Sequence, residues 1–316
     1  MKAAVVHRLG EAPKYGEFED PAAGEGEALV KVRAAGLHPV VRAIASGKHY
    51  SAEGKVPAVA GLDGVGTLED GTRVYFGGVR KPWGTMAELA AAPRGMTFRL
   101  PDGIDDTVAA ALANPGMSAW MSLKERGEVA AGERVVILGA TGVAGQMAIQ
   151  CARLLGAGRV VGVGRNVDAL AGADVDAVIG LNEPEEAVRE AFAREAAAGI
   201  DVVIDYLWGR PTELLLEALA QQFNPKATHR TRLVEVGSSA GATITLPGAT
   251  LRSVDLTLLG SGFGSARLDR IFAAIGNLFE MAAQGRLKIG VEAVPLADVE
   301  SAWNRAETGR RVVFVV

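Results

Sequence analysis

The segment Val135–Gln150, VVILGATGVAGQMAIQ, decides the fold. Its first four residues form a wholly apolar run, which is typical of a strand buried on both faces of a parallel sheet. A glycine loop follows over Gly139–Gly145, and the next residues predict an amphipathic helix over Gln146–Leu155. A strand, a glycine turn and a helix in this order open a Rossmann-type nucleotide-binding fold.

Each glycine of this loop has its own expected task. Gly139 permits a tight turn, Gly142 lets the backbone approach a pyrophosphate, and Gly145 lets the helix pack close to the strand. The helix N-terminus adds free N–H groups and the positive end of its dipole, which favour phosphate. A mere tight turn is the alternative. We expect a dinucleotide to contact the loop, at Gly139, Ala140, Thr141, Gly142, Val143 and Gly145.

The end of the next predicted strand, Arg159–Gly164, indicates which cofactor is bound. NAD sites usually carry an acidic residue there to bind the ribose 2′-hydroxyl. Here the strand runs into Arg165 and Asn166, and Asp168 comes too late to be a good substitute. Because Arg165 can bind a 2′-phosphate, the sequence predicts NADPH, with Gly164, Arg165 and Asn166 among its contacts. A solvated surface arginine is the alternative interpretation.

The rest of the chain predicts two domains, an α/β Rossmann domain with a doubly wound parallel sheet and a β-rich catalytic domain. Residues 114–263 alternate between apolar runs and helical patterns, as βαβ units do. Residues 1–113 are mainly short strands and turns, and with residues 264–316 they are assigned to the β-rich domain. The final VVFVV is expected to return to it as a buried strand. Further strands of the Rossmann domain are predicted at 176–181, 201–205, 232–237 and 255–260, and helices at 185–198 and 211–222.

Composition excludes several classes of function. The formal net charge of −4 provides no basic field for nucleic acid. No apolar run approaches the ~20 residues of a membrane span, and the first residues do not resemble a signal peptide. The single cysteine, Cys151, allows neither an internal disulfide nor a multi-cysteine zinc site. These features predict a cytoplasmic protein that acts on a small molecule and binds neither nucleic acid nor membrane.

With these pieces placed, nearly the whole chain resembles the medium-chain dehydrogenase/reductase superfamily, and within it the zinc-free quinone oxidoreductase branch. The motifs that carry the resemblance are AAGLHPVVRAIASGKHY at Ala34–Tyr50, WGTMAEL at Trp83–Leu89 and the loop Gly139–Gly145. The resemblance implies a GroES-like catalytic domain and hydride transfer from NADPH to a quinone or an α,β-unsaturated carbonyl. It also implies a homodimer joined through the strand Asp255–Gly260, an apolar strand expected at the sheet edge.

Zinc-binding members of that superfamily place a cysteine after the AAG element and a His-Glu pair after the next strand. Here Leu37 and His38 stand at the first place and Gly61-Leu62-Asp63 at the second. We therefore expect no metal. Without a metal to polarise an alkoxide, the reduction of an already activated acceptor is favoured over alcohol oxidation.

A second resemblance is to the 2-enoyl thioester reductases of the same superfamily. It is carried by Ile44–Val65 and by Asn114-Pro115. Those enzymes use a tyrosine at the place of Tyr50 as proton donor, which makes Tyr50 the candidate catalytic residue here. Tyr50 as a wall of the substrate pocket is the alternative. A protein that senses NADPH without turnover, or has a purely structural role, also stays open.

The remaining candidates contact substrate or cofactor. His38 is expected to bind a substrate oxygen, with a structural histidine as the alternative, and Trp83 is expected beside the substrate. Asn114 is expected to position Tyr50 or the nicotinamide, or to be an ordinary turn residue. Contacts to the nicotinamide or its ribose are expected after two further strands, at Gly237 and Ser238 and at Ser261, Gly262 and Phe263, the last three by resemblance to a segment that holds the carboxamide.

Overall fold

The computed structural model describes residues 1–316 except 53, 223–228 and 307–308. The chain forms two compact units. The central unit comprises Pro115–Ile275, and the terminal unit comprises Met1–Asn114 together with Gly276–Val316. The first division falls one residue beyond the boundary expected from the sequence. The second falls after Ile275 rather than at residue 264, because the helix that begins after residue 264 belongs to both units.

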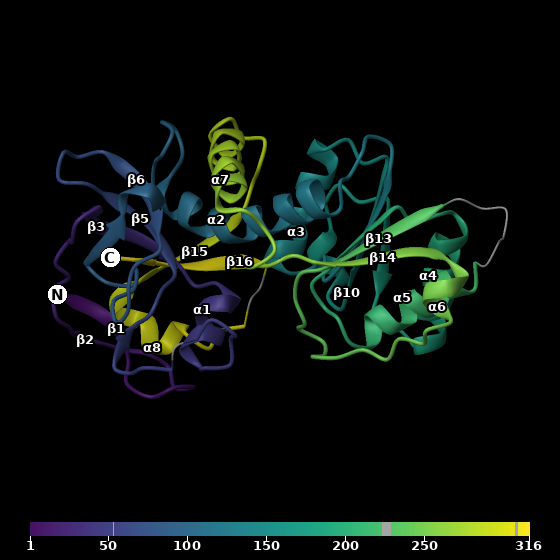
Figure 1. Cartoon of the computed structure of the whole chain (residues 1–316), viewed down its shortest axis with the longest axis horizontal. Coiled ribbons are helices and arrows are strands. Elements are labelled where there is room, and N and C mark those ends of the chain that lie inside the picture. Colours follow the sequence, from purple (N-terminus) through teal and green to yellow (C-terminus); the bar gives the residue numbers. More distant parts are fainter. Residues whose placement is uncertain (53, 223–228, 307–308) are drawn as a thin grey trace. The chain divides into compact units, whose positions relative to one another are not determined.

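A six-stranded parallel sheet forms the core of the central unit (Figure 1). Its strand order is β11-β10-β9-β12-β13-β14, and all neighbouring strands are parallel. The order reverses between β9 and β12, which confirms the doubly wound α/β architecture. The strands are β9 (Arg134–Leu138), β10 (Arg159–Gly164), β11 (Ala177–Gly180), β12 (Val202–Asp205), β13 (Arg230–Glu235) and β14 (Asp255–Gly260).

Helices cover both faces of this sheet. On one face α4 (Glu185–Ala197) and α5 (Arg210–Ala220) pack together, and their buried Phe192 and Leu215 join Val136 and Leu138 of β9 in one apolar cluster. Alternate residues of a strand point to opposite faces, so Val135 and Ile137 face the other side. There α3 (Val143–Leu154) packs on β9 and β10. Shorter segments are α6 (Thr250–Ser253) and a 3-10 turn at Val167–Leu170.

Two sheets build the terminal unit. One has seven strands in the order β15-β16-β3-β5-β6-β8, with β7 also paired to β3, and the other has the order β2-β1-β4. The strand β16 returns to this unit, as expected from the sequence, and pairs antiparallel with β3, a partner that the sequence did not predict. The strands are β1 (Lys2–Val6), β2 (Lys14–Glu17), β3 (Glu27–Gly36), β4 (Ala58–Val59), β5 (Asp63–Thr67), β6 (Arg73–Gly77), β7 (Leu89–Pro93), β8 (Thr97–Arg99), β15 (Gly290–Pro295) and β16 (Arg310–Val315).

Four further helices lie in the described part of the chain, and two of them are shared by the units. Within the terminal unit lie α1 (Pro39–Ala45) and α8 (Val299–Ala302), whereas α2 (Asp106–Trp120) and α7 (Leu268–Ala283) belong to both units. A π-helix, Met121–Arg126, continues α2. Asn114, for which a turn was one sequence interpretation, lies inside α2 beside the interior Pro115. None of the described helices is long and apolar enough to cross a membrane.

Candidate functional site

The glycine loop has the backbone geometry that its sequence predicts. Gly139 has a φ of +89°, and a Cβ there would lie 3.1 Å from Cβ of Tyr206. A Cβ on Gly145 would collide with the backbone of Gly139 and lie 2.5 Å from Cα of Ala140. The loop therefore turns tightly, and α3 rests directly on it. Gly142 is different, because a Cβ there would make only an ordinary 3.5 Å contact.

The helix α3 begins three residues earlier than expected, at Val143 instead of Gln146. The reason is that Gly142 serves as its N-cap in an extended conformation, with φ −81° and ψ 165°, and has no side chain to cap the first turn. The last residues of the loop are thus the first turn of the helix. Their N–H groups and the helix dipole together suit a phosphate.

The end of β10 lies beside this loop. A Cβ on Gly164 would lie 2.5 Å from Cγ2 of Thr141, so glycine is needed for the two segments to meet. Arg165 and Asn166 follow and are exposed. Within the described part of the chain, no hydrogen bond or ion pair engages the guanidinium of Arg165. A guanidinium at this strand tip could pair with a 2′-phosphate.

The other predicted contacts lie at the same edge of the sheet. Because all six strands are parallel, their carboxyl ends meet at one edge. Gly237 and Ser238 follow β13, and the N–H of Gly237 donates to the carbonyl of Asp205, 3.2 Å away. Ser261 follows β14, and its N–H donates to the carbonyl of Glu235 at 2.8 Å. The loop, Arg165 and these residues therefore share one edge of the central unit.

Two of the residues expected to contact the nicotinamide carboxamide already take part in hydrogen bonds within the protein. The N–H of Gly262 donates to Oγ of Ser265 at 2.7 Å, and Oγ of Ser122 donates to Oγ of Ser261 at 3.1 Å. Phe263 is exposed to 40%. A carboxamide would have to displace Ser265 from the Gly262 N–H.

Sequence reasoning did not single out a pair of carboxyl groups at this edge. Asp205 and Glu235 end the neighbouring strands β12 and β13 and lie opposite each other in register. Burial raises the pKa of Asp205, although its carboxylate accepts hydrogen bonds from Oγ1 of Thr212 at 2.5 Å and from two backbone N–H groups. Burial and then the charge of Asp205 raise the pKa of Glu235. The signal that could have found Asp205 is a lone acid closing the apolar run VVID.

In the terminal unit His38 is fully buried and faces Asp63. Its Nε2 lies 3.3 Å from Oδ1 of Asp63, and the hydroxyl of Tyr75 donates to Oδ2 at 2.7 Å. Burial and then Asp63 raise the pKa of Tyr75. Buried Arg311 donates to the carbonyl of Leu37, which precedes the histidine. The residue expected to touch substrate is thus part of an internal polar cluster, and a contact with substrate would need this cluster to open.

Tyr50 and Trp83 are not brought together with that cluster. Tyr50 is 75% exposed and packs on His49, with ring centroids 4.1 Å apart. Its hydroxyl is therefore free to meet a ligand. Trp83 is half-buried, its indole N–H donates to the carbonyl of Glu19 at 3.0 Å, and Arg80 covers its ring. Asn114 is half-buried within α2.

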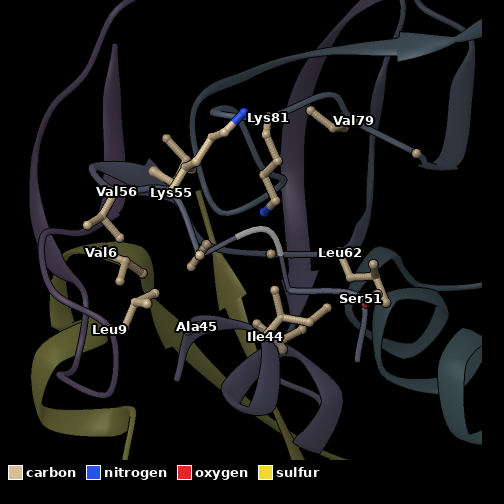
Figure 2. A pocket seen from close by; sticks show the side chains of 17 residues that line it. Val6, Leu9, Ile44, Ala45, Ser51, Lys55, Val56, Leu62, Val79 and Lys81 are labelled. Atoms are coloured by element: carbon tan, nitrogen blue, oxygen red, sulfur yellow. The ribbon is translucent and has the colours of Figure 1, made fainter. Parts of the chain in front are cut away.

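A pocket lies in the terminal unit (Figure 2). Its walls come from β1, from α1 and the following loop, and from the segments before β5 and after β6. Gly61, with a φ of +105°, forms part of the wall, and a Cβ there would lie 2.7 Å from the backbone N of Met86. Among the residues that the structure describes, no group of three or more His, Cys, Asp or Glu side chains could hold a metal ion.

The fold and the arrangement at the sheet edge define a two-unit protein with a Rossmann-type unit. No family model matches the sequence. A probable NADPH-dependent quinone reductase of Emericella nidulans is 28% identical across the whole of both chains. The human quinone oxidoreductase is 29% identical over 69% of this chain and 66% of its own. The quinone oxidoreductase of Thermus thermophilus, whose structures include a complex with NADPH, superposes over all of both chains with a TM-score of 0.81 and 28% identity.

In sequence and in fold the chain is thus similar to proteins named quinone oxidoreductases, in agreement with the resemblance inferred from the motifs.

Proposed function

We propose that this protein is an NADPH-dependent, zinc-independent oxidoreductase that reduces a quinone or an α,β-unsaturated carbonyl compound. The single observation that carries the proposal is the sheet edge of the central unit, where the glycine loop and Arg165 lie together. The relative in Emericella nidulans and the structure from Thermus thermophilus support it through the cofactor in their names.

The residues present fit this cofactor. Gly139–Gly145 and the first turn of α3 would hold the pyrophosphate, and Arg165 would hold the 2′-phosphate. Gly237, Ser238 and Ser261 would contact the nicotinamide end. When bound, NADPH supplies a hydride, which is the difficult part of the chemistry.

The protein's own contribution is to position the acceptor and to handle one proton. Holding two reactants at about 3–3.5 Å replaces a bimolecular encounter. The exposed hydroxyl of Tyr50 is the group that we assign to donate a proton to the acceptor. His38, with Asp63 and Tyr75 behind it, would hold the end of β3 and the start of α1 in place.

Two other functions remain to be separated from the proposed one by experiment. A 2-enoyl thioester reductase would use the same edge and the same tyrosine with a thioester acceptor. A sensor of NADPH would bind the cofactor without turnover. The experiment is a screen of NADPH oxidation with quinones, enones and enoyl thioesters, before and after exhaustive treatment with a chelator.

We expect turnover with quinones or enones, undiminished by chelation. A preference for enoyl thioesters would favour the 2-enoyl thioester reductase. Tight NADPH binding with no acceptor reduced would favour the sensor, and a required equivalent of zinc would refute metal independence.

A further inference from the structure

The π-helix Met121–Arg126, which continues α2, reaches the end of β14 within the central unit. Nε of Arg126 donates to the carbonyl of Gly260, the last residue of β14, at 2.8 Å. Oγ of Ser122 bonds to Oγ of Ser261, the next residue, at 3.1 Å. Single π-turns within helices are frequent at functional sites. This one holds the segment that is expected to meet the nicotinamide.

Ser261 is fixed by the protein and is still reachable by a ligand. Its N–H donates to the carbonyl of Glu235 at 2.8 Å, which ties its backbone to the end of β13. Its side-chain partner Ser122 is fully buried, whereas Ser261 itself is half-buried. A polar group held by its neighbours in this way is preorganised for a ligand. The buried serine therefore supports the accessible one from behind.

The hydroxyl of Ser122 has one proton for two acceptors. Its Oγ lies 2.6 Å from the carbonyl O of Ser118 and 3.1 Å from Oγ of Ser261. When a ligand donates to Ser261, every bond can form at once, because Ser122 donates to the Ser118 carbonyl and Ser261 donates to Ser122. When a ligand accepts from Ser261, Ser122 must donate to Ser261, and the Ser118 carbonyl loses that bond. The two serines therefore favour a ligand that donates.

We propose that Oγ of Ser261 accepts a hydrogen bond from the amide N–H₂ of the nicotinamide, and that Ser122 is the positioning residue that keeps Ser261 in the accepting role. The proposal rests on the proposed function, in which Ser261 contacts the nicotinamide end of the cofactor. An amide N–H₂ donates hydrogen bonds, so the two serines would distinguish a carboxamide from a ring substituent without an N–H. One neutral hydrogen bond of this kind changes affinity by about 2- to 10-fold.

Calorimetry with NADP⁺ and two of its analogues measures binding without turnover. The acetylpyridine analogue has a methyl group in place of the amide N–H₂. The thionicotinamide analogue keeps the N–H₂ and has sulfur in place of the carbonyl oxygen. We expect the wild type to bind NADP⁺ about 2- to 10-fold more tightly than the acetylpyridine analogue. Ser261→Ala should abolish this preference and leave the ratio between NADP⁺ and the thionicotinamide analogue as in the wild type.

The variant Ser122→Ala tests the positioning role. It leaves the Ser261 hydroxyl without its acceptor, so the preference for NADP⁺ over the acetylpyridine analogue should weaken. Adenosine 2′,5′-bisphosphate, which lacks the nicotinamide half, should bind the wild type and both variants equally. Ser253→Ala is the matched control and should keep the preference. Oγ of Ser253 likewise bonds to a carbonyl of its own helix, that of Thr250, but the residue lies before β14 rather than after it.

The possible failures are distinguishable. Equal binding of NADP⁺ and the acetylpyridine analogue by the wild type would overturn the proposal, even in a protein that reduces quinones. So would a Ser261→Ala variant that changes only the ratio with the thionicotinamide analogue, because Ser261 would then donate to the carbonyl.

An unchanged preference in Ser122→Ala, or an equal loss of affinity for NADP⁺ and adenosine 2′,5′-bisphosphate, would refute the positioning role of Ser122. A wild-type protein that binds neither of these two ligands would overturn the proposed function and the role of both serines together.

Discussion

Arg165 is the residue on which the choice of cofactor depends. Its guanidinium is exposed at the tip of β10, next to the glycine loop. We expect Arg165→Ala to weaken NADPH binding about 10- to 100-fold, because a charge-assisted bond to the 2′-phosphate is lost. NADH affinity should not change. The dissociation constants of both cofactors check this, with the exposed Arg94→Ala as control. Equal affinities for NADPH and NADH in the wild type would contradict the assignment.

Tyr50 separates the two classes of acceptor. Tyr50→Phe removes only the hydroxyl, and the ring is largely in solvent, so folding and NADPH affinity should hardly change. A positioned acid contributes about 10²–10⁴-fold to a proton transfer to carbon. We therefore expect kcat with an enone to fall by about that factor. Quinone reduction should fall little, because quinone oxygens take protons readily from water. Near wild-type enone turnover in the variant would exclude Tyr50 as the acid.

Single residues also show where sequence reasoning stops. The roles of Gly139 and Gly145 could be predicted, because the glycine spacing alone implies a tight turn and a close approach of the helix, and the structure shows both. The environment of His38 could not, because its neighbour Asp63 is brought to it by the pairing of β3 with β5. That pairing is a long-range contact, and no local pattern specifies it. The sequence therefore located the histidine without showing that it is buried.

The junction of β9 and α3 depends on close packing. We expect Gly145→Ala to destabilise the protein by about 1–3 kcal/mol or more, because the new Cβ meets backbone that cannot move aside. NADPH binding should weaken as well, since the first turn of α3 must shift. Thermal unfolding and cofactor titration would measure the two effects.

A second glycine provides the control for that substitution. Gly276 lies inside α7, and a Cβ there would meet nothing within 4 Å. Gly276→Ala should be neutral or stabilise the protein by about 0.5–1 kcal/mol, the helix preference of alanine over glycine. If Gly145→Ala is as well tolerated as Gly276→Ala, the close-packing argument is wrong.

The strands of the central unit were predictable, and some helices were not. Short apolar runs bounded by polar or glycine residues predicted β10 and β14 with the bounds that the structure has. The helix α2 gave no comparable signal, because Pro115 lies in its interior and proline usually interrupts a helix. Its alanine-rich sequence, buried on most sides, also lacks the polar face that marks an amphipathic helix.

The strand β14 is a candidate dimer contact. It forms an edge of the six-stranded sheet, and Leu258 within it is 36% exposed. Exposed apolar edges tend to be paired or covered. We expect the wild type to be a dimer and Leu258→Lys to be largely monomeric at micromolar concentration. Light scattering after size-exclusion chromatography would measure this, and a purely monomeric wild type would rule out the proposed interface.

The two helices that belong to both units have a consequence for dissecting the protein. The division at Asn114 and Pro115 falls inside α2, and the division at Ile275 and Gly276 falls inside α7. A fragment cut at either point would end in a broken helix whose terminal N–H or carbonyl groups have lost their partners. Proteases cut exposed loops far more readily than helices, so limited digestion should not release the units separately at these positions. A chimera in which the Rossmann-type unit is replaced by that of a relative would therefore have to include both helices in full.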